Sequence, residues 1–412
     1  MIRHGLALAC ACLLAGGCSL RSRPAPAAME RPATLDVATR VEHLDTLTRE
    51  PMLVEHPSGA LFVAGYNGHR PGLWKSMDRG ATWARVDVGS ESQGAIGNSD
   101  VDLAVAQDGT LYFVSMGFDR TTREGTHIAI GVSRDAGTTW RWTMVSRTRF
   151  DDRPWVAVAP DGTAHVIWND GHGVNHAVSR DRGVTWTRMG RVYDRGGSSH
   201  LAVGPRGEVA VRVAPGAASG TKCDEGVDLI AVSTDAGATW RTSAAPGGQR
   251  PSGCGHDPLK IPRWVDPIAW DAAGALYSLW TDSAGVRLAR STDRGTTWAS
   301  WRIAEAEAVT YYPYLVARAS GELAATWFTG VGDSLRWRAA RINVRADGTE
   351  PTVIRSAPMP LESWFFSPLR PDPGGEYLAI SFLSEGDVAV VTPIQHESAH
   401  RLGFTWWRFV SR

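Results

Sequence analysis

Three side chains that can do acid–base or nucleophilic chemistry stand at the starts of short β-rich segments in this chain of 412 residues. They are Asp152, His200 and Tyr312. A positioned carboxyl or imidazole group can transfer a proton, and a tyrosine hydroxyl can act as a nucleophile or an acid. Arg153 follows Asp152 directly, and a guanidinium group can hold an anionic group in one plane. We therefore interpret these four residues, together with Asp266, as the candidate centre of a site that acts on a polar substrate.

The segments that must position these residues are hairpins repeated along the chain. Seven times, two β-rich runs flank a turn that contains glycine, at residues 51–63, 101–114, 154–168, 200–212, 267–280, 313–327 and 368–382. A repeat of about 50 residues, without the periodicity of amphipathic helices, predicts an all-β ring of four-stranded antiparallel blades, which is a β-propeller. Seven units favour seven blades, and six blades are the alternative. A further β-rich run at residues 35–43 could pair with the last blade and close the ring.

An octapeptide with the pattern Ser-x-Asp-x-Gly-x-Thr-Trp follows five of these hairpins, at residues 76–83, 133–140, 179–186, 233–240 and 291–298. Its aspartate can accept hydrogen bonds from backbone N–H groups, its glycine can adopt a positive φ, and its tryptophan can cover the blade. We interpret the octapeptides as structural turns, because five turns spread around a ring do not converge on one ligand. The sixth unit has no such octapeptide, and residues 403–406 are interpreted as a remnant in the seventh, with Arg401 in the place of the aspartate.

The octapeptide is the Asp box, so the chain resembles the sialidase-like (BNR-repeat) β-propellers. The resemblance implies that each box connects strands C and D of a blade, counted from the ring axis outward, and that the boxes lie on the back face. The ligand site of such proteins lies on the opposite front face, over the central channel. That face is built by the B–C loops and by the D–A loops, which join strand D of one blade to strand A of the next.

On this front face the sequence supplies a set of polar residues. The catalytic candidates are Asp152, Tyr312 and His200. The candidates for substrate binding are Arg153, Arg120, Arg70, His69, Asp170, His172 and Asp266. The same loops also carry Glu50, Asp100 and Asp102. We expect no metal ion and no cofactor, because the histidines at positions 69, 172, 200 and 256 lack the local spacing of zinc ligands.

The sialidase resemblance also has a test within the sequence. Sialidases combine a tyrosine nucleophile with an acid–base aspartate and three arginines that hold the substrate carboxylate. The first of these arginines belongs to a Phe/Tyr-Arg-Ile-Pro motif, which this chain lacks, since residues 260–263 read Lys-Ile-Pro-Arg. We therefore do not expect a true sialidase. The resemblance implies a propeller that binds a glycan at its front face and could cleave it as a glycoside hydrolase.

Two alternatives stay open. One is a non-catalytic propeller that binds glycan or protein, or helps to assemble an envelope complex, through aromatic side chains of the same face. The other is a polysaccharide lyase that uses His200, Tyr312 and Arg153. Whether the protein is an enzyme at all is therefore not decided by its sequence.

Residues 1–18 have the pattern of a bacterial export signal, in which Arg3 and His4 precede an apolar run that ends in small residues. Cys18 follows directly, and this arrangement resembles a lipobox, in which the cysteine is acylated and becomes the new N-terminus. Residues 19–34 are expected to form a flexible tether and residues 35–412 a single propeller domain. We expect an exported protein of the bacterial cell envelope, anchored by lipid to the outer membrane. Secretion without an anchor is the alternative.

Charge and cysteine content narrow the expected partners. Lysine and arginine number 43, as do aspartate and glutamate, so the formal net charge is zero, which argues against a nucleic-acid partner. The expected partners are a glycan or other small polar ligand and the membrane through the lipid anchor, and they could include an envelope protein. Cys223 and Cys254 are the cysteines outside the signal and its lipid site, and an oxidising envelope would let them form a disulfide.

Overall fold

The computed structural model describes residues 33–214, 227–247, 265–307, 309–331, 334–361, 366–367, 370–371, 375–396 and 400–411. Cys18, Cys223 and Cys254 lie outside these residues. The chain divides into two compact units, Met1–Ala33 and Thr34–Arg412, and every described strand belongs to the second unit. Within the described residues, no helix is long and apolar enough to cross a membrane.

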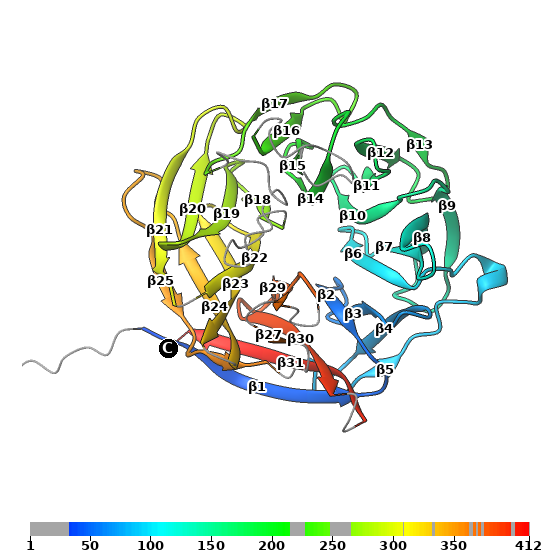
Figure 1. Ribbon diagram of the computed structural model, residues 1–412, viewed down its shortest axis with the longest axis horizontal. Coiled ribbons are helices and arrows are strands. Elements are labelled where there is room, and N and C mark those ends of the chain that lie inside the picture. Colours follow the sequence, from blue (N-terminus) through cyan, green and yellow to red (C-terminus); the bar gives the residue numbers. More distant parts are fainter. Residues whose placement is uncertain are drawn as a thin grey trace, which may run out of the picture. The chain divides into compact units, whose positions relative to one another are not determined.

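Thr34–Arg412 forms a ring of seven four-stranded antiparallel blades (Figure 1). Blade 1 consists of β2 (Arg49–Glu55), β3 (Leu61–Tyr66), β4 (Pro71–Ser76) and β5 (Ala84–Arg85). Blade 2 consists of β6 (Ser99–Val105), β7 (Leu111–Asp119), β8 (Glu124–Ser133) and β9 (Arg141–Ser146). Blade 3 consists of β10 (Asp152–Val158), β11 (Ala164–Asn169), β12 (Val174–Ser179) and β13 (Thr187–Arg188). Blade 4 consists of β14 (Gly197–Val203), β15 (Val209–Ala214), β16 (Leu229–Ser233) and β17 (Arg241–Ala244). Blade 5 consists of β18 (Ile268–Trp270), β19 (Leu276–Asp282), β20 (Gly285–Ser291) and β21 (Ala299–Glu305). Blade 6 consists of β22 (Val309–Ala317), β23 (Glu322–Val331), β24 (Ser334–Asn343) and β25 (Thr352–Arg355). The prediction of an all-β propeller with seven blades is confirmed, and the six-bladed alternative is wrong.

Blade 7 closes the ring with strands from both ends of the domain. It consists of β29 (Ile380–Phe382), β30 (Val388–His396), β31 (Arg401–Ser411) and, as its outermost strand, β1 (Leu35–Leu44). β1 pairs antiparallel with β31, from Leu35 opposite Ser411 to Leu44 opposite Gly403. The strand predicted at residues 35–43 therefore does close the ring.

The seventh hairpin lies later in the chain than the sequence suggested. Strand A of blade 7 is β29, and its turn closes where the amide of Gly386 donates to the carbonyl of Leu383. The hairpin predicted at residues 368–382 is therefore wrong, because the Gly374-Gly375 pair precedes strand A instead of following it. The supposed box remnant at 403–406 is also no turn, since it lies inside β31, whose outer neighbour β1 comes from the start of the domain.

Four short elements lie outside this scheme. β26 (Met359–Pro360) pairs with β24, β27 (Phe366–Ser367) and β28 (Arg370–Pro371) pair with each other, and the 3₁₀ helix η1 (Glu91–Gln93) stands between blades 1 and 2.

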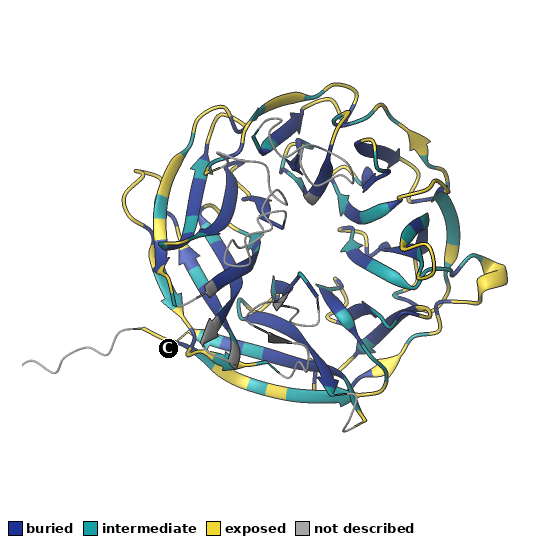
Figure 2. Cartoon of the chain, in the orientation of Figure 1, coloured by how far each residue is buried: buried dark blue, intermediate teal, exposed yellow. Residues whose placement is uncertain are grey.

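The core lies between the blades. All six residues of β11 and all six of β15 are buried, whereas both residues of the outer strand β13 are exposed (Figure 2). A strand covered on both faces can be apolar throughout, which explains why these segments lack the alternation of half-exposed strands. One apolar cluster joins Tyr112 of blade 2 to Val166 of blade 3, so adjacent blades share their core.

The five octapeptides form the same turn between strands C and D. In the first, Asp78 Oδ1 accepts from the amide of Thr82 (2.8 Å) and Oδ2 from the Thr82 hydroxyl (2.5 Å), while the Ser76 hydroxyl accepts from the amide of Gly80 (2.8 Å). Gly80 has a φ of 87°. Bonds from Thr82 hold the pKa of Asp78 down at about 2. The aspartates at 135, 181, 235 and 293 are bound in the same way, which confirms the structural reading of the motif.

Contacts between blades assign the two faces. Arg182, in the octapeptide turn of blade 3, pairs with Asp108, in the A–B turn of blade 2 (2.9 Å). The A–B turns and octapeptide turns therefore share the back face. On the other side, Arg149 of the D–A loop into blade 3 donates to Glu124 at the B–C loop of blade 2 (2.7 Å). B–C and D–A loops thus share the front face, as predicted.

Candidate functional site

Three blades begin strand A with the same strained bulge. Glu50, Arg153 and Tyr312 have φ angles of 45°, 47° and 47°, and each precedes a proline. Proline cannot donate to the ladder, and the register of strand A shifts at each of these places. A non-glycine residue at positive φ costs about 1–3 kcal/mol and persists only where its surroundings hold it. Bulges of this kind redirect side chains, and here they occur at the front ends of inner strands.

Two of these residues belong to a polar cluster to which four blades contribute residues. Arg153 of blade 3 pairs with Glu376, just before blade 7 (Nη2–Oε2, 3.0 Å), and with Asp152 (Nη1–Oδ2, 3.6 Å). Glu50 of blade 1 accepts from the backbone amide of Glu376 (3.0 Å). Asp100 of blade 2 is coupled electrostatically to the same groups. We name the group the axial cluster, since its strands line the inside of the ring (Figure 1); it comprises Glu50, Asp100, Asp152, Arg153, Glu376 and Tyr377.

The cluster has an open side and a buried side. The side chains of Asp152, Glu376 and Arg153 are 43%, 26% and 19% exposed. Glu50 and Tyr377, by contrast, are 6% and 5% exposed. A ligand that approaches the front of the ring would therefore meet Asp152 and Glu376 first.

Burial and mutual repulsion shift the protonation of these groups. Burial, followed by repulsion from Asp100 and Glu376, raises the pKa of Glu50 well above its ordinary value. Burial and then the charge of Asp152 raise the pKa of Asp100 to about 6. Burial lowers the pKa of Arg153, but Glu376 and Asp152 outweigh it and the net change is upward. Asp100 is therefore a carboxyl group of the cluster that exchanges its proton near pH 6, and Glu50 also holds its proton to higher pH than an ordinary glutamate.

Beside the cluster stands a buried aromatic stack that contains His200. The His200 ring lies 4.5 Å from Trp155 and 5.0 Å from Tyr314, and Trp155 meets Tyr377 edge-on at 4.9 Å. His200 is only 4% exposed. His200 therefore packs within an aromatic layer beside the axial cluster, and the catalytic role predicted for it stays a prediction.

Tyr312 is also buried, at 5% exposure, with its ring 5.1 Å from that of Tyr311. Both tyrosines belong to an extended apolar cluster among the described residues. The catalytic role predicted for Tyr312 stays a prediction.

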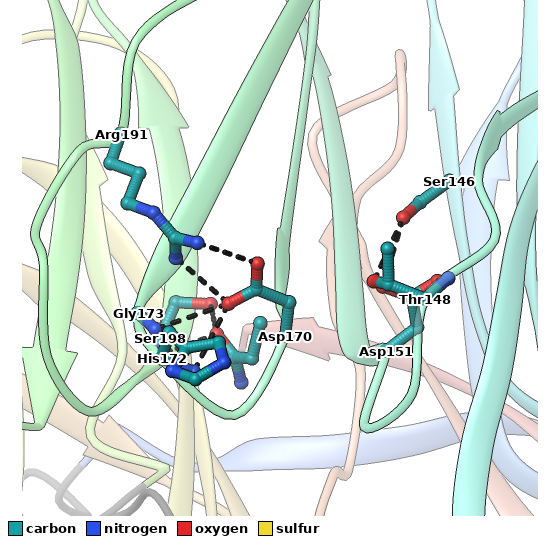
Figure 3. A network of polar contacts seen from close by, with 9 residues as sticks. Ser146, Thr148, Asp151, Asp170, His172, Gly173, Arg191 and Ser198 are labelled. Carbon is teal, nitrogen blue, oxygen red and sulfur yellow. Dashed lines mark hydrogen bonds and ion pairs between the residues drawn. The ribbon is translucent and has the colours of Figure 1, made fainter.

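Two predicted binding residues are held by arginines of the scaffold. Asp170 accepts from both terminal nitrogens of Arg191 (2.8 Å each) and from the amides of His172 and Gly173 (Figure 3). Burial opposes the shift, but the bond from Arg191 and the other donors lower the pKa of Asp170 to about 2. His172 itself is exposed beside this turn. Asp170 therefore shapes the B–C loop of blade 3.

Asp266 belongs to a fully buried triad. Arg212 of β15 pairs with Asp228 (2.8 Å) and with Asp266 (3.2 Å), and the three side chains are at most 1% exposed. The triad ties blade 4 to the start of blade 5.

The remaining predicted residues lie on the front loops of blades 1 and 2. Arg120 rests over Gly68, where an added Cβ would come 1.8 Å from Nη2. Arg70 lines a cavity of about 280 Å³ together with Arg85. His69 lines a second cavity of about 310 Å³ with Phe118 and His127, among others. Of the predicted binding residues, Arg153 is the one that these contacts bring together with Asp152.

Sequence reasoning missed Glu376 and Tyr377. Gly374-Gly375 was interpreted as a hairpin turn, which would place Glu376 at the back of the ring. A D–A loop position was the signal that could have found both residues. Among the described residues, no group of three or more His, Cys, Asp or Glu is arranged to hold a metal ion.

No protein-family model matches the chain, and no curated protein matches its sequence. Its fold is similar to that of solved β-propellers. An ulvan lyase of polysaccharide lyase family 25, bound to -[GlcA(1-4)Rha3S]-, aligns with a TM-score of 0.55 and 11% identity over 91% of this chain and 98% of that one. The GH74 xyloglucanase from Xanthomonas campestris aligns with a TM-score of 0.54 and 16% identity over 88% of this chain and 52% of that one. The chain spans 65% of the Hadza microbial sialidase Hz136, at 15% identity, 75% coverage of this chain and a TM-score of 0.46. At these identities the likeness shows the propeller fold alone.

Proposed function

We propose that the protein binds a glycan at the front of the ring and cleaves it by carboxylate acid–base catalysis at the axial cluster. The observation that carries this proposal is the convergence of Asp100 and Asp152, from adjacent blades, around Arg153. Asp100 has a pKa of about 6 and can donate a proton to a glycosidic oxygen. Asp152, exposed at the open side, can activate water or attack the sugar. Arg153 then acts as a positioning residue that fixes Asp152 and Glu376.

The same contacts weigh against the other two activities. A sialidase-type clamp needs guanidinium groups available to a substrate carboxylate, whereas Arg153 is engaged by Glu376 and Asp152. A lyase that relies on His200 needs that imidazole to reach substrate, whereas His200 lies in the aromatic stack. Hydrolysis by a pair of carboxyl groups fits the cluster better, because Asp100 and Asp152 both belong to it.

The proposal is tested by a hydrolysis screen of the purified protein on neutral, amino-substituted and acidic oligosaccharides. Asp152→Asn and Asp100→Asn should each lower turnover about 100-fold or more. Asp194→Asn is the matched control, because Asp194 is an exposed aspartate in the D–A loop into blade 4. Absence of turnover on every glycan, with binding detected by calorimetry, would overturn catalysis and leave the non-catalytic binder. Turnover that survives both substitutions would overturn the assignment of residues.

The location in the cell envelope is proposed on the sequence alone. A lipid on Cys18 would hold the ring outside the cytoplasm, where polysaccharides of the envelope are within reach. Replacement of Cys18 by alanine should move the protein from the membrane fraction to the soluble fraction of fractionated cells.

A further inference from the structure

The axial cluster contains more acid than base. Four carboxyl groups, from Glu50, Asp100, Asp152 and Glu376, gather there. The basic groups coupled to them are Arg153 and Arg49, the latter acting on Glu50. Arg153 is shared between Glu376 and Asp152, and in the described part of the chain neither Glu50 nor Asp100 forms an ion pair. Four carboxyl groups thus share two guanidinium groups, so acidic groups outnumber basic groups in the cluster.

A second observation comes from Tyr377. Its side chain is 95% buried, since 5% is exposed, and within the described residues its hydroxyl has no hydrogen-bond partner. Arg153, Glu376, Glu50 and Asp100 all act electrostatically on that hydroxyl, which therefore lies near the cluster. A buried hydroxyl without a partner is uncommon, and here it could donate to or accept from a ligand group that reaches the cluster.

We propose that the axial cluster receives an ammonium group and that the ligand is an amino sugar, such as a glucosamine unit of a glycan. This inference rests on the proposed glycan-binding function and names its substrate class. An ammonium group is compact, carries three donors and suits several carboxylates at once. A neutral sugar would leave the excess charge in place, and an acidic sugar would add to it. A metal ion fits less well, because Arg153 stands among the carboxylates and the described residues offer no metal-binding group of three.

The raised pKa of Glu50 gives the proposal a measurable consequence. A cation beside a carboxyl group favours its ionised form. Binding of an ammonium group at Glu50 should therefore release a proton from the protein, while Asp100 keeps the proton that the proposed hydrolysis needs.

The test compares two tetrasaccharides by titration calorimetry on the purified protein: the glucosamine tetramer and its N-acetylated counterpart, which is neutral. We expect the amine to bind at least tenfold more tightly at low salt and to lose that advantage in concentrated salt. Titrations in buffers of different ionisation enthalpy should show proton release for the amine alone. Equal affinities, or no proton release, would overturn the inference without any need for a variant.

Variants locate the effect. The Glu50→Gln/Asp100→Asn double variant should bind both tetramers equally, and Tyr377→Phe should weaken the amine by several-fold. Asp194→Asn should keep the full preference. If the double variant still preferred the amine, the ammonium group would not bind at Glu50 and Asp100. If spermidine bound as tightly as the glucosamine tetramer, the site would recognise an amine without a sugar.

The two proposals fail in different ways. Cleavage of neutral glycans with no preference for the amine would sink the inference and keep the hydrolase. Tight binding of the glucosamine tetramer without cleavage would support the inference and sink the hydrolase.

Discussion

The side-chain carboxylate of Glu50 accepts a hydrogen bond from the backbone amide of Glu376, across 326 positions of sequence. The bond links the first blade to the last on the front face, separately from the pairing of β1 with β31. Gly375 makes the approach possible, because a Cβ there would lie 2.1 Å from Cγ of Glu50.

Gly375→Ala should therefore lower the free energy of unfolding by about 2–4 kcal/mol, since a steric clash is added to the strain of a φ of 138°. Gly348→Ala is the control, because Gly348 also has a positive φ, 76°, and nothing lies within 4 Å of its added Cβ. Denaturant titration should show a much smaller loss for the control. Equal losses would mean that the contact with Glu50 is not tight.

Arg212→Met should be among the most damaging single changes. It removes the buried guanidinium group that pairs with both Asp228 and Asp266, and loss of one partner of a buried ion pair costs about 3–5 kcal/mol. Arg302→Met, which removes an exposed ion pair with Glu305, should cost less than about 1 kcal/mol. A small loss for Arg212→Met, measured by the midpoint of guanidinium unfolding, would show that the two aspartates become protonated or solvated instead.

Asp135→Ala should lower stability by about 1–2 kcal/mol and leave glycan binding unchanged. The substitution removes the acceptor for the amides of Thr138 and Thr139 and for the Thr139 hydroxyl. Asp194→Ala should have little effect on thermal unfolding. A change in affinity for glycan in Asp135→Ala would contradict the structural role of the octapeptide.

Stability should fall on acidification because of a buried histidine pair. His165 Nδ1 and His176 Nε2 lie 3.1 Å apart, and burial lowers their pKa values to about 4 and about 3. Both stay neutral in the folded ring, whereas the unfolded chain takes up protons below about pH 6.5. The stabilisation is therefore complete above that pH and is lost as the pH falls towards 4, by at least about 2 kcal/mol. His165→Gln/His176→Gln should flatten this dependence in denaturant titrations, and His172→Gln, at an exposed position, should not.

If Asp100 is the acid, kcat/KM should fall about tenfold per pH unit above about pH 6, because only the protonated carboxyl group can donate. Asp102, whose pKa is raised to about 7 by burial, is the other group that could cause such a fall in kcat/KM. Both of its carboxylate oxygens accept hydrogen bonds from backbone amides, Oδ1 from Leu103 and Oδ2 from Val156. The fall in kcat/KM above pH 6 should therefore persist in Asp102→Asn. If it disappeared in that variant, Asp102 rather than Asp100 would be the acid.

The repeats made most of the fold predictable. Hairpins with a glycine turn, together with the octapeptide, gave the blades, the strand order and the two faces. The error in blade 7 has a local cause: Gly374-Gly375 is a stronger turn signal than Ser384-Glu385-Gly386, where the chain actually turns. Local composition could not show which of two glycine-containing stretches would meet a strand from the other end of the domain.

The sequence indicated which face of the ring carries the candidate site better than it indicated which residues of that face form the site. Asp152, Asp170 and Asp266 hold similar front positions, yet Asp170 is bound by Arg191 and Asp266 by Arg212. Whether an aspartate is free to act depends on partners from other strands, and one sequence does not show those pairings. Arg153 was correctly placed beside Asp152, but its partner Glu376 comes from the mispredicted blade.

The pairing of β1 with β31 also sets the order in which the molecule can be completed. β1 is synthesised before every other strand of the ring, yet its partner is the last strand of the chain to be made. Until then six blades can form as local meanders, while β1 and β30 each expose an unpaired edge. Closure of so long a loop is entropically costly and slow, so the final association of these strands is expected to limit the folding rate. A chain truncated before residue 401 would be an open ring with two edges ready to pair with other chains.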